Sequence, residues 1–413
     1  MSGRGLGRDN GQPGGGNGAG RAGADGGYPS RRGLLKVGMA AAAVAGTGAR
    51  RAGGTAGRHH GGLRQPGSLP FPRLPAGTDT IPQIEPIVVL MMENHSYDNY
   101  LGMLRRPGAD SFRLGRVGQP LAANPYPDGR IQHAFHMPTT CQLSGHPAQD
   151  WLASHTQFDG GRLDGFVASS SGPVAMGFWR RQDLPFYYSL ASLFPLADRY
   201  FCSLLGQTFP NRRYLLAATS IGQVDDTIPA LTDYPPNGTI FDQLDAHQVS
   251  WLDYVTDQAS TELFPPLFLK NQGTRVVPIS QFFADADAGT LPNYSLVEPN
   301  YSTQSKKDPQ NIATGEGFAA SVINAVMSGP AWHKTLLIWT YDEHGGHFDH
   351  VPPPRAIPPD SIAPQVPDGR DPPSTASAGT GSACPARSYR RGRAPASSHT
   401  GYSTTPPSSS CWR

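Results

Sequence analysis

Two widely separated segments of this 413-residue chain place polar side chains directly after short apolar runs. Glu93 and Asn94 end the first run, and Asp342 and Glu343 end the second. Three carboxylates and an amide that met in one place would repel one another unless a cation neutralised them. Oxygen ligands of this kind suit a hard divalent ion. The sequence therefore predicts one divalent metal ion held by Glu93, Asn94, Asp342 and Glu343.

The two apolar runs, 87–92 and 336–341, have the composition of buried parallel strands. Parallel α/β sheets bind ligands just beyond the carboxyl ends of their strands, which is where the four polar residues would lie. A helix is expected over 317–328, closed by Gly329 and leading into the second strand.

Further segments continue the alternation of helix and strand. Thr239 can cap a short helix over 241–247, and a strand is expected over 249–255. The stretch 184–194 is apolar nearly all round, which predicts a buried helix whose aromatic residues belong to the core. Sequential units of this kind predict an α/β fold with a mostly parallel sheet sandwiched by helices.

The same segments carry a family resemblance. ENHSYDNYLG, which starts at Glu93, and DEHGGHFDHVPPP, which starts at Asp342, are similar to two motifs of the bacterial phosphoesterase family. The resemblance extends over roughly 81–362. That family includes phosphatidylcholine-type phospholipases C and acid phosphatases, and the resemblance implies an alkaline-phosphatase-like fold and metal-dependent hydrolysis of phosphoric esters.

The resemblance also implies a nucleophile in the segment GQTFPNRRY. By this resemblance Thr208 would attack phosphorus and form a phospho-threonine intermediate. Asn211 would donate a hydrogen bond to a phosphate oxygen. Arg212 would do the same, or would brace the loop through a carboxylate.

Histidines are concentrated in the matched motifs, where the leaving alkoxide would need a proton donor. His350 is the candidate general acid, and His155 and His344 are candidate phosphate contacts. His95, His146 and His347 lie in the same motifs, and the sequence does not rank them.

Two segments, 159–167 and 176–188, resemble the phospholipase branch more than the phosphatase branch. We therefore expect a phospholipid substrate and transient contact with a membrane surface. Acid phosphatase activity on soluble monoesters is the alternative, and an inactive truncated secreted remnant is the second alternative. The formal net charge of +2 provides no reason to expect a nucleic-acid partner.

The first 76 residues differ in composition from the rest. Residues 1–29 are too glycine-rich to form a core, so they are expected to be disordered. Residues 30–49 resemble a twin-arginine signal peptide, with Arg31 and Arg32 before a short apolar run. Residues 50–76 would be a linker. We therefore expect export by the twin-arginine machinery and a secreted or cell-wall location.

The catalytic domain is expected over 77–368, and the remaining residues, 369–413, form a Ser-, Pro- and Arg-rich tail. An ordinary secreted tail of this composition is one explanation. The other, which we expect, is a frameshift, because in the shifted frame 373–378 can read F-D-R-L-G and 403–410 can read D-H-T-S-V-L-V, which resemble segments of the family. The frameshift predicts that the last strands of the sheet and an aspartate–histidine–threonine segment are missing. Cys141 and Cys202 could pair in an oxidising compartment.

Overall fold

The computed structural model describes residues 71–75, 78–141, 146–305 and 311–366. They belong to the second of two compact units, which begins at Arg51. The predicted leader, export signal and tail lie outside the described residues, as does the predicted frameshift, and so does most of the predicted linker.

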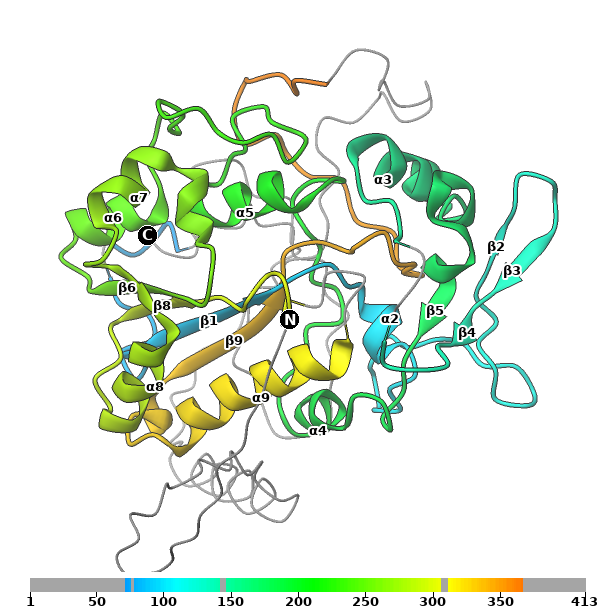
Figure 1. Cartoon of the computed structure of the whole chain (residues 1–413), viewed down its shortest axis with the longest axis horizontal. Coiled ribbons are helices and arrows are strands. Elements are labelled where there is room, and N and C mark those ends of the chain that lie inside the picture. The colour runs from blue at the N-terminus through cyan, green and yellow to red at the C-terminus, as the bar shows by residue number, and fades with distance from the viewer. Residues whose placement is uncertain (1–70, 76–77, 142–145, 306–310, 367–413) are drawn as a thin grey trace, which may run out of the picture. The chain divides into compact units, whose positions relative to one another are not determined.

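The central element is a parallel sheet with the strand order β7-β6-β8-β1-β9 (Figure 1). Its strands are β1 (Ile87–Met92), β6 (Trp251–Val255), β7 (Val276–Pro278), β8 (Tyr294–Val297) and β9 (Leu336–Tyr341). The bounds of β1 and β9 are those predicted from the apolar runs. The α/β class and the parallel sheet are therefore confirmed.

Helices cover both faces of this sheet (Figure 1). One face carries α4 (Pro185–Leu193), α8 (Ile279–Ala288) and α9 (Ile312–Ser328), and the other carries α5 (Thr208–Ala217), α6 (Ile240–Ala246) and α7 (Pro265–Asn271). Because alternate side chains of a strand point to opposite faces, β1 contributes to two cores. Val88 and Leu90 belong to one core and Val89 and Met91 to the other.

The predicted helices at 241–247 and 317–328 are present as α6 and α9, and Thr239 caps α6. The prediction for α4 was partly wrong. The helix forms, but it buries Tyr187, Tyr188 and Ala191 while Leu193 is 49% exposed. Since one side of α4 packs on the core and the other faces solvent, an apolar composition alone did not establish burial all round.

Smaller elements lie to one side of the main sheet (Figure 1). They are the helices α2 (Tyr97–Leu101) and α3 (Trp151–Phe158), the antiparallel pair β2 (Ala123–Pro125) and β3 (Ile131–His133), and the short parallel pair β4 (Phe135–His136) and β5 (Gly177–Phe178). Among the described residues, no helix has the length and apolar character needed to cross a membrane.

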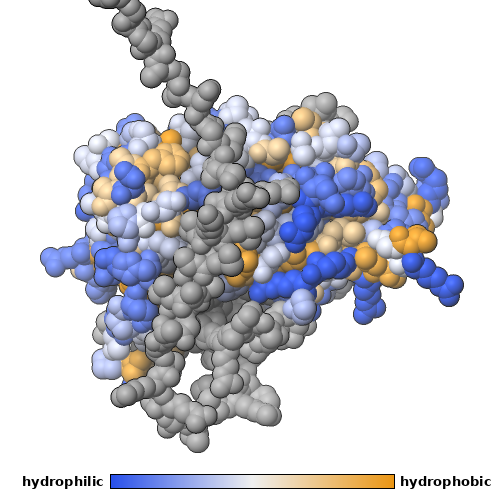
Figure 2. Space-filling view, turned by 90° about the horizontal axis from the view of Figure 1, so that it is seen from below, coloured by the Kyte–Doolittle hydropathy of each residue, from blue (hydrophilic) through white to orange (hydrophobic). Residues whose placement is uncertain are grey.

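The hairpin of β2 and β3 and the loop that precedes it expose apolar side chains. Leu121 is 56% exposed, Ile131 is 55% exposed and Val117 is 87% exposed. Figure 2 shows apolar side chains beside strongly hydrophilic ones at the end of the molecule where this hairpin protrudes in Figure 1.

The suggested pairing of Cys141 with Cys202 is wrong, because Cys141 carries a free thiol. The two residues belong to different parts of the fold. Cys141 forms an isolated bridge with Asn311, just before α9, whereas Cys202 packs with Phe201 and Leu205.

Candidate functional site

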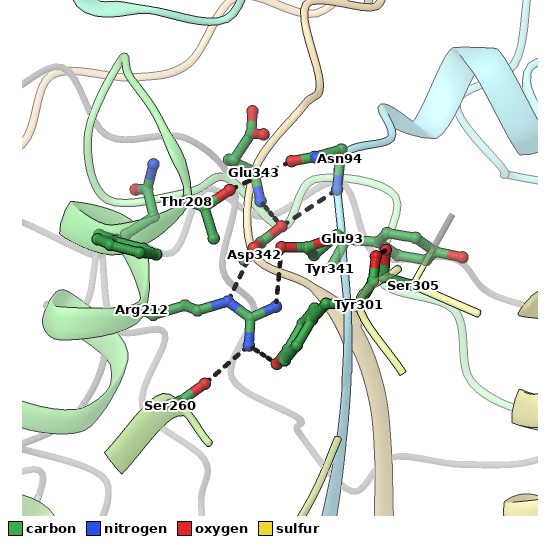
Figure 3. Close-up of polar contacts among 12 residues, drawn as sticks. Glu93, Asn94, Thr208, Arg212, Ser260, Tyr301, Ser305, Tyr341, Asp342 and Glu343 are labelled. Carbon is green, nitrogen blue, oxygen red and sulfur yellow. Dashed lines mark hydrogen bonds and ion pairs between the residues drawn. The ribbon is translucent and has the colours of Figure 1, made fainter. Parts of the chain in front are cut away.

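The two predicted acidic segments meet at the carboxyl ends of β1 and β9 (Figure 3). The strands pair in register so that Met92 lies opposite Tyr341, which places Glu93 beside Asp342. The backbone N–H of Asn94 donates to Asp342 Oδ1 at 3.1 Å. Glu93, Asn94, Asp342 and Glu343 are all buried, with exposures of 4, 2, 6 and 3%. The structure therefore brings the four predicted metal ligands together, and their binding of an ion stays a prediction.

Backbone conformation holds the two segments in close contact. Asn94 adopts φ 66° and Gly345 adopts φ 66°, both in the left-handed region. A Cβ atom on Gly345 would lie 2.0 Å from the carbonyl oxygen of Asn94. Only glycine permits this approach, which explains the glycine that follows so soon after Asp342 and Glu343 in the sequence.

Thr208 is the first residue of α5, and it is 4% exposed. Its Oγ1 lies 3.5 Å from Asn94 Oδ1, at the edge of the acidic group (Figure 3). The N-terminus of a helix attracts negative charge, because the first backbone N–H groups are free to donate there and the helix dipole is positive at that end. The predicted nucleophile therefore lies at the acidic group and at a position that suits a phosphate.

Arg212 lies one helical turn after Thr208 and points into the acidic group (Figure 3). Its Nε lies 2.9 Å from Asp342 Oδ2, and its Nη1 lies 2.8 Å from Glu298 Oε2. Burial opposes the charged form of Arg212, but Tyr301 and the neighbouring carboxylates Asp342, Glu298 and Glu93 raise its pKa well above the ordinary value. Arg212 was predicted either to contact phosphate or to brace the loop through a carboxylate, and in this structure it contacts the carboxylate of Asp342.

The side-chain amide of Asn211 is held by backbone groups of the turn before α5. Its Oδ1 accepts from the backbone N–H of Leu204, and its Nδ2 donates to the carbonyls of Leu204, Gly206 and Gln207 at 3.0 to 3.2 Å. Both amide hydrogens are engaged by these carbonyls. In this conformation Asn211 holds the turn that leads into α5 and has no hydrogen left for a phosphate oxygen.

Of the two candidate phosphate contacts among the histidines, His155 is buried and His344 is partly buried. His344 Nδ1 lies 3.0 Å from Glu343 Oε2, and its Nε2 is buried with no hydrogen-bond partner in residues 71–366 as far as the structure describes them. Burial lowers the pKa of His344 to about 4, so the ring is neutral near pH 7. His155 Nδ1 lies 2.7 Å from the carbonyl oxygen of Trp151, within α3, and burial lowers its pKa. Their contact with phosphate stays a prediction.

His350, the predicted general acid, is held between two carboxylates. Its Nδ1 lies 2.7 Å from Asp98 Oδ2 and its Nε2 lies 3.1 Å from Asp110 Oδ1. Burial lowers the pKa of His350, but the hydrogen bond to Asp98 and the charges of Asp98 and Asp349 outweigh it and raise the pKa to about 9. Both ring nitrogens are engaged in this conformation, so proton donation to a leaving group would require one contact to open.

Asp98, Asp349 and His350 form a second cluster, and one ligand atom from each lies within 4.8 Å of the others. Burial, followed by the charge of Asp98, raises the pKa of Asp349 to about 8. Ser96 Oγ also donates to the Phe348 carbonyl at 2.6 Å. These contacts fasten the start of α2 to the loop after β9, and so connect the two acidic segments a second time.

Sequence reasoning missed Glu298, Tyr301 and Asp110. Glu298 is fully buried and directly follows β8, so it repeats the layout of an acid after an apolar run that identified Glu93 and Asp342. That signal was present in the sequence. The contacts of Tyr301 and Asp110 are made across the fold, and no local pattern indicates them.

A family model described as "Phosphoesterase family" matches residues 84–386. Non-specific phospholipase C1 of Arabidopsis thaliana is 33% identical over 304 residues, which cover 68% of this chain and 56% of that protein. Phospholipase C A of Mycobacterium tuberculosis is 31% identical over 319 residues, which cover 67% of this chain and 61% of that protein. The aligned part thus spans little more than half the length of these relatives. Because the family model matches most of the chain, the chain belongs to the phosphoesterase family.

Proposed function

We propose that this chain hydrolyses phosphoric esters, with phosphatidylcholine-type phospholipids as its first substrate class. The observation that carries the proposal is the position of Thr208, whose Oγ1 lies 3.5 Å from Asn94 Oδ1 beside buried acids from β1 and β9. Family membership and the phospholipase C relatives support the reaction class.

The donor set fits a divalent cation. Glu93, Asp342 and Glu343 offer carboxylate oxygens, Asn94 offers an amide oxygen, and Thr208 offers a hydroxyl, all of them buried. Such oxygen ligands are the ones that hard divalent ions prefer. When bound, the ion would supply a lower pKa for the attacking hydroxyl and would stabilise charge on the phosphoryl oxygens.

The reaction would then proceed in two steps. Thr208 Oγ1 gives up its proton and forms a bond to phosphorus, the bond from phosphorus to the leaving alcohol breaks, and the leaving oxygen takes up one proton. Water next attacks the phospho-threonine, which restores the hydroxyl and releases the phosphate group. Asn94 Nδ2 is buried and has no hydrogen-bond partner among the described residues, so we assign it to a phosphoryl oxygen of the substrate.

The phospholipid would be reached through contact with a membrane surface. Leu121, in the loop just before β2, and Ile131, on β3, are the apolar side chains that we assign to this contact. Arg113 and Arg116, which are also exposed, would favour anionic lipids. Replacing Leu121 and Ile131 together by serine should reduce sedimentation with phosphatidylcholine vesicles and leave hydrolysis of a soluble monoester unchanged.

Export by the twin-arginine route would bring the enzyme to such a surface, outside the cell or at the cell wall. The support is the arrangement of Arg31 and Arg32 before an apolar run. Replacing both arginines by lysine should keep the protein inside the cell, as measured by fractionation.

One experiment tests the substrate class. The purified chain is incubated with a divalent ion and either phosphatidylcholine vesicles or p-nitrophenyl phosphate. We expect diacylglycerol and phosphocholine in equal amounts from the vesicles. Faster release of p-nitrophenol than of phosphocholine would favour the acid phosphatase alternative. Turnover of neither substrate, with the chain folded and metal-loaded, would favour the inactive remnant.

A further inference from the structure

Arg212 lies in a cage of oxygen atoms at the carboxyl ends of three neighbouring strands, β8, β1 and β9. Its Nη1 lies 2.8 Å from Glu298 Oε2 and 2.7 Å from Ser260 Oγ, and it also donates to the hydroxyl of Tyr301. Its Nε lies 2.9 Å from Asp342 Oδ2, and its Nη2 lies 3.9 Å from Glu93 Oε1. The side chain is 3% exposed.

This cage has the composition of a metal site. Three carboxylates and two hydroxyls face one buried volume, and such sets of oxygen ligands bind hard divalent ions. The cage also shares Glu93 and Asp342 with the predicted metal site, so the two volumes are adjacent (Figure 3).

The buried carboxylates of the cage and of the adjacent metal site need positive charge close to them. Glu93, Glu298, Asp342 and Glu343 bring four carboxylates to one buried region, where uncompensated charge is costly. One divalent ion would balance two of them. The guanidinium of Arg212 contributes one further positive charge, fixed to the same helix as the nucleophile.

We propose that Arg212 takes the place of a second metal ion, so that the oxygen cage of Glu93, Glu298 and Asp342 holds a guanidinium and the site next to it holds one divalent ion. This inference rests on the proposed function, since it concerns the number of ions that the site binds. Arg212 is thereby a positioning residue: it holds Asp342 from one side and fixes α5, with Thr208 one turn away, against the strand ends.

The test counts bound Mn²⁺ on the full chain. After removal of metal with a chelator, Mn²⁺ is titrated into the wild-type protein and into Arg212→Met, and the bound ions are counted by elemental analysis. Arg213→Met is the matched control, because Arg213 is also buried in α5 but its guanidinium nitrogens have no hydrogen-bond partner in the part of the chain that the structure describes. We expect one more equivalent of Mn²⁺ in Arg212→Met than in the wild type, and no change in Arg213→Met.

A charge-compensated variant keeps the test valid if Arg212→Met does not fold. In Arg212→Met with Glu298→Gln, one positive and one negative charge are removed together. We expect this double variant to fold and to bind as many ions as the wild type. If circular dichroism shows that it is also unfolded, Arg212 acts through packing and the proposal is overturned.

The counts also separate this inference from the proposed function. If the wild type binds no Mn²⁺, the metal-dependent reaction fails, but a gain of one ion in Arg212→Met would still support the role of the guanidinium. If folded Arg212→Met binds as many ions as the wild type, the inference is wrong and the proposed function is untouched. An extra ion in Arg213→Met as well would overturn the inference too, because the gain would then not depend on the oxygen cage.

Discussion

Asn94 and Asp342, which are 248 residues apart in the sequence, are joined by a hydrogen bond from the Asn94 backbone N–H to Asp342 Oδ1 at 3.1 Å. The other carboxylate oxygen of Asp342 accepts from Arg212 at 2.9 Å. One buried carboxylate thus connects the first acidic segment, the second acidic segment and the helix that carries Thr208.

Asp342→Asn should weaken both metal binding and the fold. The change removes a carboxylate ligand of the ion. It also removes one of the negative charges that balance the buried guanidinium of Arg212, which should lower the unfolding free energy by about 3 kcal/mol. A divalent ion at a hundredfold excess over its Kd should stabilise the wild type by about 2.7 kcal/mol, which is measured as a higher melting temperature. The same ion should leave the melting temperature of the variant nearly unchanged. Asp287→Asn is the control, because Asp287 is exposed. Equal shifts in all three proteins would contradict the assignment.

Thr208→Ala should lower turnover of a phosphoester by a factor of at least about a thousand, because the covalent route needs the hydroxyl. Thr208→Ser should retain much of the activity, since it keeps the hydroxyl at the start of α5. Both variants should melt at nearly the wild-type temperature. Substantial turnover by metal-loaded Thr208→Ala would show that a different group attacks phosphorus.

Gly345→Ala should destabilise the protein far more than Gly273→Ala. Both glycines have positive φ, at 66° and 74°. A Cβ on Gly345 would lie 2.0 Å from the Asn94 carbonyl oxygen, whereas a Cβ on Gly273 would meet no atom within 4 Å. Gly273→Ala should therefore cost only the left-handed strain, about 1 kcal/mol. Urea unfolding measures the difference, and similar losses in the two variants would contradict the close contact.

Stability should fall as the pH rises from about 6.5 to about 9. The pKa of His350 is raised to about 9, so its contribution is complete below its unfolded pKa and is lost as the pH rises through 9. Asp349, with its pKa raised to about 8, changes stability in the same direction. Allowing for the partial exposure of His350, we expect a loss on the order of 2 kcal/mol.

The matched variant for this pH dependence is His350→Gln, which can keep one hydrogen bond but cannot carry a charge. Its unfolding free energy should vary less than that of the wild type over the same pH range. A profile parallel to that of the wild type would show that His350 does not hold its proton between Asp98 and Asp110.

The sequence by itself determined the strands that carry the site. The runs 87–92 and 336–341 became β1 and β9 with the predicted bounds, because a short, uninterrupted apolar run between polar neighbours is a local signal. The position of the acids beyond these strands followed from the parallel α/β layout. Glu298 after β8 obeys the same rule, and sequence analysis could have found it.

The tertiary structure alone decided how the predicted metal ligands are braced and which other side chains join them. The register of β1 with β9 put Glu93 beside Asp342, and the packing of α5 on the strand ends put Arg212 between Asp342 and Glu298. The turn before α5 engaged the side chain of Asn211, whose predicted contact with phosphate does not fit this conformation. The Asn211 contacts stay within seven residues along the chain. Those of Arg212 join residues that are far apart in the sequence, so its partners depend on how helices and strands pack, which no local pattern of residues encodes.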